Sequence, residues 1–279
     1  MSIIEEAVRK TAEQHRGVPP AASSARPRAR PAPAAPIDPA QVRHFQTVPA
    51  DRALLEKYCV LPQVSDQAAL RAYKILRTRV LRRLEASHWH SFAVTGVTAG
   101  VGKTLTAINL SIALAQDPST SVFLLDLDLE RPRIAHYLGM TGMRGEHGLS
   151  DYLLGNASID SIIYSPEIER LAVIPNFEAI SQSSELLTSP RMAQLLHALE
   201  AEVPRRILVV DMPPVLASDD VIAFAPQVDA MLLVIAEGIT ARDAVRSAKE
   251  VLAEMNLLGV VLNRSAERDD NAYYHYARP

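Results

Sequence analysis

The sequence has a single cysteine, few aromatic residues and no long apolar segment. Cys59 is the only cysteine among 279 residues, so no disulfide can form within the chain, which fits a reducing compartment. No apolar run approaches the roughly 18 to 20 residues that a membrane-spanning helix needs, and the first residues lack the pattern of a signal peptide. We therefore expect a soluble, cytoplasmic protein.

The composition predicts one globular domain with additional terminal segments. Apolar residues make up 48% of the chain and charged residues 22%, a balance that allows a chain of this length to bury a full core. The first 50 residues hold seven basic and four acidic residues, whereas residues 51–279 hold 22 and 28, which leaves this larger part with a net charge of −6. An acidic body of this kind argues against a nucleic-acid partner.

Local composition divides the chain into four parts. Residues 1–15 are expected to form a short amphipathic helix, because Ser2 and Glu5 have capping-box spacing and the apolar residues share one face. Residues 16–64 are interpreted as a linker rich in Pro, Ala and Arg. Residues 65–263 are expected to form the globular domain. Residues 264–279 hold three of the eight tyrosines behind a polar stretch, which is typical of a flexible tail.

Apolar strands alternate with amphipathic helices throughout the expected domain. A helical pattern begins near Ser65, and helices are also predicted at residues 104–116, 149–155, 190–202, 219–225 and 240–255. Strands are predicted at residues 92–95, 122–128, 171–175, 207–211, 230–236 and 258–263. This alternation predicts an α/β fold with a mostly parallel sheet that is covered by helices on both faces.

A glycine-rich loop follows the first of these strands and ends in Gly102-Lys103-Thr104. A strand, such a loop and a helix in this order form the context of a phosphate-binding P-loop. Backbone N–H groups would surround the phosphates, Lys103 would pair with them, and the Thr104 hydroxyl would reach a bound Mg²⁺. The residues predicted to contact nucleotide at the loop are Gly100, Val101, Gly102, Lys103, Thr104 and Leu105. The strict motif has glycine where this chain has Val97, and Gly96 indicates a variant loop.

Three aspartates lie at the carboxyl ends of two later strands, at positions 126, 128 and 211. Ligands of parallel α/β sheets bind beyond these strand ends, so the three carboxylates are expected to surround one metal-bound nucleotide. Any single one of them could instead cap a helix. Asn263, at the end of the last predicted strand, could meet the adenine or serve as a turn residue.

Several motifs resemble those of the bacterial tyrosine kinases of the polysaccharide-synthesis (CpsD/CapB) type. They are A-Y-K-I-L-R-T (72–78), the P-loop, L-L-D-L-D-L-E-R-P (124–132), S-E-L-L-T-S-P-R-M (184–192), V-V-D-M-P-P (209–214), G-V-V-L-N (259–263) and Y-Y-H-Y (273–276). The resemblance implies a P-loop NTPase fold with ATP and Mg²⁺ as cofactors. It also implies Thr104, Asp128 and Asp211 as metal ligands, with Lys103, Asp126 and Asp128 in the catalytic set and Asp126 as the base.

The resemblance further implies an autokinase whose phosphate acceptors are Tyr273, Tyr274 and Tyr276. Phosphorylation of all three would add roughly 5 to 6 negative charges to the tail, which would weaken its docking on an acidic neighbouring subunit and loosen a homo-oligomer. The opening M-S-I-I-E-E-A and the Pro-rich segment are similar to those of kinases paired with exopolysaccharide systems. The implied partner is a membrane polysaccharide co-polymerase, which would hold the chain peripheral to the inner membrane.

Two other classes of protein remain open at this point. Partition or positioning ATPases share the P-loop fold, but they usually carry an early lysine in the loop, where this chain has Thr98. A nucleotide-binding, non-catalytic adaptor of the polysaccharide machinery would lack phosphotyrosine altogether. The kinase family's oligomerisation helix usually reads E-x-x-R-x-x-R, whereas the matching positions here are Arg71, Lys74 and Arg77.

Overall fold

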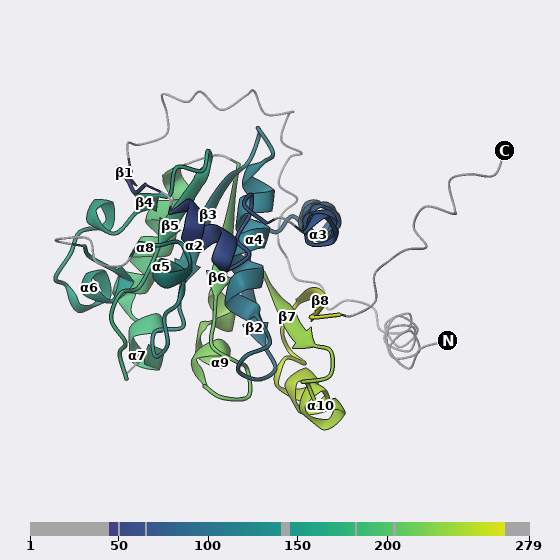
Figure 1. Ribbon diagram of the computed structural model, residues 1–279. Helices are drawn as coiled ribbons and strands as arrows, with labels where there is room; N and C mark the ends of the chain where they lie inside the picture. The colour runs from purple at the N-terminus through teal and green to yellow at the C-terminus, as the bar shows by residue number, and fades with distance from the viewer. Residues whose placement is uncertain are drawn as a thin grey trace. The chain divides into compact units, whose positions relative to one another are not determined.

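The computed structural model describes residues 45–49, 51–64, 66–140, 146–181, 183–202 and 205–265. Its centre is an eight-stranded sheet with the order β1-β4-β5-β3-β6-β2-β7-β8 (Figure 1). Every neighbouring pair is parallel except β4 and β5. The mostly parallel α/β fold predicted from the sequence is therefore confirmed.

The strands are β1 (Gln46–Thr47), β2 (Ser91–Gly96), β3 (Ser121–Asp126), β4 (Tyr164–Ser165), β5 (Leu171–Ile174), β6 (Arg206–Asp211), β7 (Ala230–Ala236) and β8 (Leu257–Asn263). The helices are α2 (Arg52–Lys57), α3 (Gln67–Ser87), α4 (Lys103–Ala115), α5 (Ile134–Tyr137), α6 (Leu149–Leu154), α7 (Ser183–Leu187), α8 (Pro190–Glu202), α9 (Asp220–Phe224) and α10 (Arg242–Val251). Short 3-10 turns occupy Ile159–Ser161 and Ala225–Gln227.

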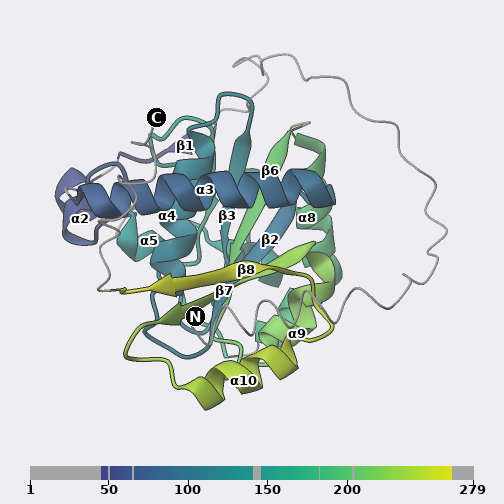
Figure 2. The same ribbon diagram turned by 90° about the vertical axis from the view of Figure 1, so that its right-hand side faces the viewer.

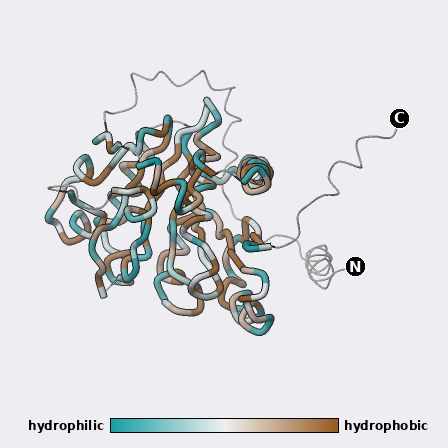
Figure 3. Tube along the Cα trace, in the orientation of Figure 1, coloured by the Kyte–Doolittle hydropathy of each residue, from teal (hydrophilic) through white to brown (hydrophobic). Residues whose placement is uncertain are grey.

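The core consists of two apolar layers, one on each face of the sheet. Alternate residues of β2 show the division, because Phe92 and Val94 belong to the layer under α3 and α4, whereas Ala93 belongs to the layer under α8 and α10. Figure 3, in the orientation of Figure 1, colours the chain by hydropathy and shows brown, apolar stretches along the strands at the centre of the domain. Helices on both faces bury the sheet, which explains why its central strands are almost entirely apolar.

Helix α3 begins close to Ser65, where the sequence pattern predicts its start. The Asp66 carboxylate accepts a hydrogen bond from the Ala68 backbone N–H, and His88 ends the helix in the left-handed conformation. The apolar face packs on α4, with Val80 and Leu84 buried. None of the described helices is long and apolar enough to cross a membrane.

The predicted linker over residues 16–64 is wrong in its last part. Residues 46–47 pair with β4, and α2 follows with Leu55 buried. The Asn109 side chain of α4 accepts a hydrogen bond from Leu61 N–H at 2.8 Å and donates one to the Cys59 carbonyl at 3.0 Å. This segment therefore belongs to the globular domain, whose described part begins before residue 65. The expected helix over 1–15 lies outside the described residues.

Candidate nucleotide site

The glycine-rich loop connects β2 to the amino end of α4, as the motif predicts. Gly102 is the N-cap of α4 with φ of 90°, a conformation that favours glycine, and no side chain caps the first turn of the helix. The backbone N–H groups of that turn are therefore available to an anion. A Cβ on Gly96 would lie 2.5 Å from Val101 Cγ2, and Val97 is fully buried. Compared with the strict motif, the loop therefore has its first glycine one position earlier, at Gly96, and the side chain of Val97 packs in the core.

Lys103 and Thr104 both contact carboxylates from neighbouring strands. Lys103 Nζ lies 2.7 Å from Asp128 Oδ2 and 3.5 Å from Asp211 Oδ2. The Thr104 hydroxyl donates to Asp211 Oδ2 at 2.6 Å. The four side chains come from the P-loop helix and from the ends of β3 and β6, which are elements far apart in sequence. The predicted convergence of Lys103, Thr104, Asp128 and Asp211 is therefore what the fold produces.

Asp126 has a different environment from the one its position alone suggested. Strand β3 ends at Asp126, so Asp128 lies in the following turn and not on the strand as the range 122–128 predicted. Asp126 Oδ2 accepts hydrogen bonds from the backbone N–H groups of Arg133 and Ile134, at the start of α5. Asp126 Oδ1 is buried and has no hydrogen-bond partner. One oxygen thus caps a helix, and the other is available for chemistry.

The pair of Asp126 and Asp211 concentrates negative charge in the interior. The two residues are directly in register between β3 and β6, and both are fully buried. Burial, reinforced by the Asp211 carboxylate, raises the pKa of Asp126 well above its ordinary value. Burial also raises the pKa of Asp211 to about 6, although Lys103 and Thr104 act in the opposite direction. Lys103 is affected in turn: its burial lowers its pKa, but the attraction of Asp211 and Asp128 outweighs this and raises the pKa overall.

The raised pKa of Asp211 predicts a stability that falls as the pH rises. In the unfolded chain this carboxyl releases its proton near pH 4, whereas in the folded protein it does so near pH 6. Asp211→Asn is therefore expected to gain stability relative to the wild type between pH 4 and 6, by roughly 3 kcal/mol at the upper end. Chemical denaturation of both proteins without nucleotide, at a series of pH values, measures this difference. A constant difference across that range would contradict the assignment.

The site has features that fit a metal-bound nucleotide. Three carboxylates face one lysine, which leaves an excess of negative charge, and Asp126 Oδ1 and Asp211 Oδ1 lack partners. Among the described residues, no three His, Cys, Asp or Glu side chains converge as a complete metal cage. Mg²⁺ is usually held by one or two carboxylates together with phosphate oxygens and water, and the carboxylates at this site fit that role.

The remaining predicted contact residues also lie at the loop, with the exception of the tyrosines. Asn263, the last residue of β8, donates a hydrogen bond from Nδ2 to the Val101 carbonyl at 2.8 Å, and its amide lies against Gly102. Gly100 is exposed with open space above it, and Leu105 is half-buried in the first turn of α4. Tyr273, Tyr274 and Tyr276 lie outside the described residues.

Two contacts near the site escaped the sequence patterns. The Ser183 hydroxyl lies 2.8 Å from both carboxylate oxygens of Asp220, which is buried at the start of α9. The Thr95 hydroxyl donates to the Pro213 carbonyl at 2.7 Å and joins the end of β2 to the segment after β6. In the sequence, Asp220 is part of the polar run that follows D-M-P-P, but this run does not reveal that Asp220 contacts Ser183 in α7.

Comparison with known proteins agrees with this geometry. Residues 92–277 match the family described as the CobQ/CobB/MinD/ParA nucleotide binding domain. The chain is 30% identical to tyrosine-protein kinase YwqD of Bacillus subtilis over 208 residues, which cover 73% of this chain and 84% of YwqD. It is also 30% identical to tyrosine-protein kinase Etk of Escherichia coli over 74% of this chain. The chain spans only 28% of the length of Etk, and likewise 28% of EpsB of Ralstonia solanacearum.

The fold leads to the same group of proteins. The structure matches the kinase domain of Escherichia coli tyrosine kinase ETK with a TM-score of 0.67 and 27% sequence identity. The match covers 82% of this chain and 91% of that domain. The chain therefore belongs to the bacterial tyrosine-kinase family, within the wider CobQ/CobB/MinD/ParA group of nucleotide-binding domains.

Proposed function

We propose that this chain is an ATP-dependent protein-tyrosine autokinase that phosphorylates its own C-terminal tyrosines. The observation that carries the proposal is the contact of Lys103 and Thr104 with carboxylates at the ends of β3 and β6, in a chain of the bacterial tyrosine-kinase family. Phosphoryl transfer needs positioned phosphates and neutralised charge more than it needs covalent participation of the protein. At this site α4 supplies the groups that would position the phosphates, and the carboxylates at the ends of β3 and β6 would hold the metal that neutralises charge.

Thr104, Asp128 and Asp211 are the residues that would hold Mg²⁺. The Thr104 hydroxyl and Asp211 already lie 2.6 Å apart, and the unpartnered Asp211 Oδ1 has a free position for a ligand. When bound, the ion offsets the charge that the phosphates bring to a site already rich in carboxylates. Lys103 would leave Asp128 to contact the phosphates, and the N–H groups at the start of α4 would orient them.

Asp126 is the proposed proton acceptor. The tyrosine oxygen bonds to the γ-phosphorus while the bond from that phosphorus to the bridging oxygen of ADP breaks, and the phenolic proton moves to a carboxylate. Asp126 Oδ1 is buried without a partner, and the raised pKa of this carboxyl increases its affinity for a proton. The two backbone N–H groups on Asp126 Oδ2 would hold the carboxylate in place during the transfer.

The five described tyrosines are poor acceptors compared with the tail. Tyr152 and Tyr164 are buried, and burial raises the pKa of Tyr73. Tyr58 and Tyr137 are partly buried and pack against each other edge to face, with ring centroids 5.2 Å apart. A phenol held in such packing would need local unfolding to enter the site of another molecule. This supports Tyr273, Tyr274 and Tyr276 as the acceptors.

A variant with Phe at positions 273, 274 and 276 is therefore expected to lose essentially all incorporated phosphate. Incubation of the full chain with Mg²⁺-ATP, followed by intact mass and peptide mapping, measures the change. The same samples report assembly size by light scattering, which should fall after ATP treatment in the wild type only.

The matched control is the double variant Tyr58→Phe/Tyr137→Phe, which removes the hydroxyls of two partly buried tyrosines of the described domain and should keep full phosphorylation. Phosphate that persists in the tail variant would contradict the assignment of the acceptors. ATP hydrolysis without any phosphotyrosine, with the wild-type tail present, would instead favour a partition-type ATPase.

The same proposal includes regulation of exopolysaccharide or capsule synthesis together with a membrane co-polymerase, with the chain cytoplasmic and peripheral to the inner membrane as a homo-oligomer. It is supported by the resemblance of the first residues and of the Pro-rich segment to kinases of exopolysaccharide systems. If the isolated chain binds ATP but transfers no phosphate, repeating the mass measurement with the partner's cytoplasmic tail separates a dormant kinase from a non-catalytic adaptor.

A further inference from the structure

Strand β8 is an edge of the sheet and has no neighbour on its outer side among the described residues. Its seven residues, Leu257–Asn263, include no charged residue and no proline. Edge strands present unpaired backbone N–H and C=O groups, and proteins usually protect them with charges, prolines or a covering element. The described part of this chain offers none of these protections at β8, which leaves its edge open to pairing with another strand.

The side chains of β8 strengthen this indication. Leu257, Val260 and Leu262 are 43%, 51% and 46% exposed. Their register partners in β7 are Met231, Leu233 and Ile235, so they lie on the face of the sheet that α10 covers. Leu233 is only 4% exposed, so α10 buries β7 but leaves the apolar side chains of β8 open. We call Leu257, Val260 and Leu262 the β8 strip.

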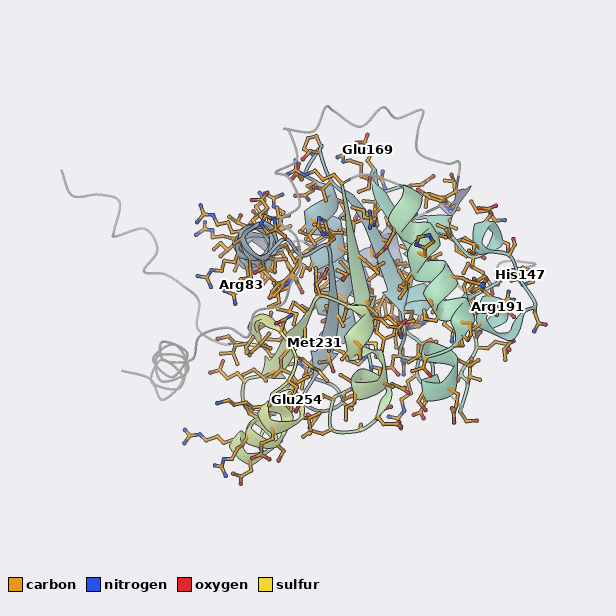
Figure 4. All side chains as sticks on the ribbon, turned by 180° about the vertical axis from the view of Figure 1, so that it is seen from behind. Arg83, His147, Glu169, Arg191, Met231 and Glu254 are labelled. Atoms are coloured by element: carbon orange, nitrogen blue, oxygen red, sulfur yellow. The ribbon has the colours of Figure 1, made fainter. Side chains whose placement is uncertain are left out.

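The opposite face of the same edge is strongly basic. Helix α3 crosses this face and contacts β8, and Figure 2, which looks onto the edge, shows β8 between α3 and α10. Arg79 and Arg82 of α3 are exposed and have no ion-pair partner among the described residues. Arg83, whose guanidinium lies 5.8 Å from the centre of the Trp89 ring, lies on the side of α3 toward β8 and α10 (Figure 4).

These observations select one kind of occupant. A second copy that paired antiparallel through β8 would bring two basic α3 helices onto one face, and their repulsion opposes that assembly. An anionic membrane would attract α3 but could not satisfy the backbone groups of an edge strand. A peptide strand can pair with the backbone groups of β8 and also complement the charge of α3. Its successive side chains point to opposite faces, so one set can lie on the β8 strip and the other beside α3.

We propose that β8 binds an extended segment of a partner protein by strand addition. The segment alternates apolar residues, which pack on the β8 strip, with acidic residues, which pair with the cations of α3. The β8 strip and the cations of α3 lie outside the carboxylate cluster, although β8 ends at Asn263, which contacts the P-loop. The proposal does not depend on the proposed kinase activity.

The test uses fluorescein-labelled ten-residue peptides and the full chain, measured by fluorescence anisotropy. The probe alternates Glu with Val, one control alternates Lys with Val, and a second control has N-methyl groups on the backbone amides of one edge. Val260→Glu changes the β8 strip and Arg79→Glu changes α3. The matched control variants are Ile222→Glu on α9 and Lys57→Glu on α2, which are exposed positions outside the proposed surface.

The Glu/Val peptide is expected to bind the wild type, and Val260→Glu and Arg79→Glu should each weaken it at least about tenfold. The control variants should bind as the wild type does, and both control peptides should bind weakly. Three results would overturn the proposal. The first is that the Glu/Val peptide does not bind at millimolar concentration. The second is that anionic phosphatidylglycerol vesicles bind the chain and that Arg79→Glu, but not Val260→Glu, weakens this binding. The third is that the wild type is a dimer and that Val260→Glu dissociates it.

Discussion

Lys103→Met is expected to reduce phosphoryl transfer by about a thousandfold or more. Among the described residues, Lys103 is the only cation that contacts the carboxylates of the site, and in the proposed mechanism it moves from Asp128 to the phosphates. Methionine has a similar length but no charge, so the fold around the P-loop should be retained while the phosphates lose their fixed cation. Intact-mass measurement of phosphate incorporation over time, with Mg²⁺-ATP, gives the rates of both proteins.

The same variant is expected to be less stable than the wild type in the absence of metal. Without Lys103, the buried carboxylates of Asp128 and Asp211 keep no compensating charge, which costs up to about 3 to 5 kcal/mol unless they take up protons. Added Mg²⁺ should restore part of this loss. Lys249→Met on the exposed face of α10 is the matched control and should change neither rate nor stability. An Lys103→Met protein that transfers phosphate at the wild-type rate would contradict the role of the lysine.

The elements that carry the chemistry could be predicted because their patterns are local. Apolar runs predicted β2, β3 and β6 and the carboxylates at or just after the ends of β3 and β6, and the spacing Gly102-Lys103-Thr104 predicted the start of α4. The rule that ligands bind beyond the carboxyl ends of parallel strands then brought Asp211 to Thr104, although 107 residues separate them. Motif and topology together were sufficient for this part of the site.

The rest depended on contacts that have no periodic signal. Residues 45–64 hold scattered apolar side chains without helical or strand spacing, and their place in the domain is set by the Asn109 amide and by burial of Leu55 and Leu61. The sequence left a helix-cap role open for each aspartate, but it did not show which one caps a helix; the structure gives that role to Asp126, which accepts from the backbone at the start of α5. Short elements such as β4 and α5 are stabilised by the domain around them and not by their own propensity.

Asp128→Asn is expected to change nucleotide binding in two opposite directions. Asp128 Oδ2 lies 2.7 Å from Lys103 Nζ, so any phosphate that uses this lysine must compete with a largely buried carboxylate. Asparagine keeps the shape but removes the charge, which frees Lys103. Metal-free ADP should therefore bind the variant about tenfold more tightly than the wild type. The proposed loss of a Mg²⁺ ligand should at the same time reduce phosphoryl transfer by about a hundredfold or more.

Calorimetric titration of ADP with Mg²⁺ and with EDTA distinguishes these two effects. In the wild type, Mg²⁺ should strengthen ADP binding, because Asp128 and Asp211 would hold the ion and Lys103 would then be free to contact the phosphates. In Asp128→Asn that gain should be much smaller. Asp229→Asn is the matched control, since Asp229 binds the backbone at the start of β2, at the opposite end of that strand from the P-loop, and should leave the effect of Mg²⁺ unchanged. Weaker binding of metal-free ADP to Asp128→Asn would mean that Asp128 contributes to phosphate binding directly and does not compete for Lys103.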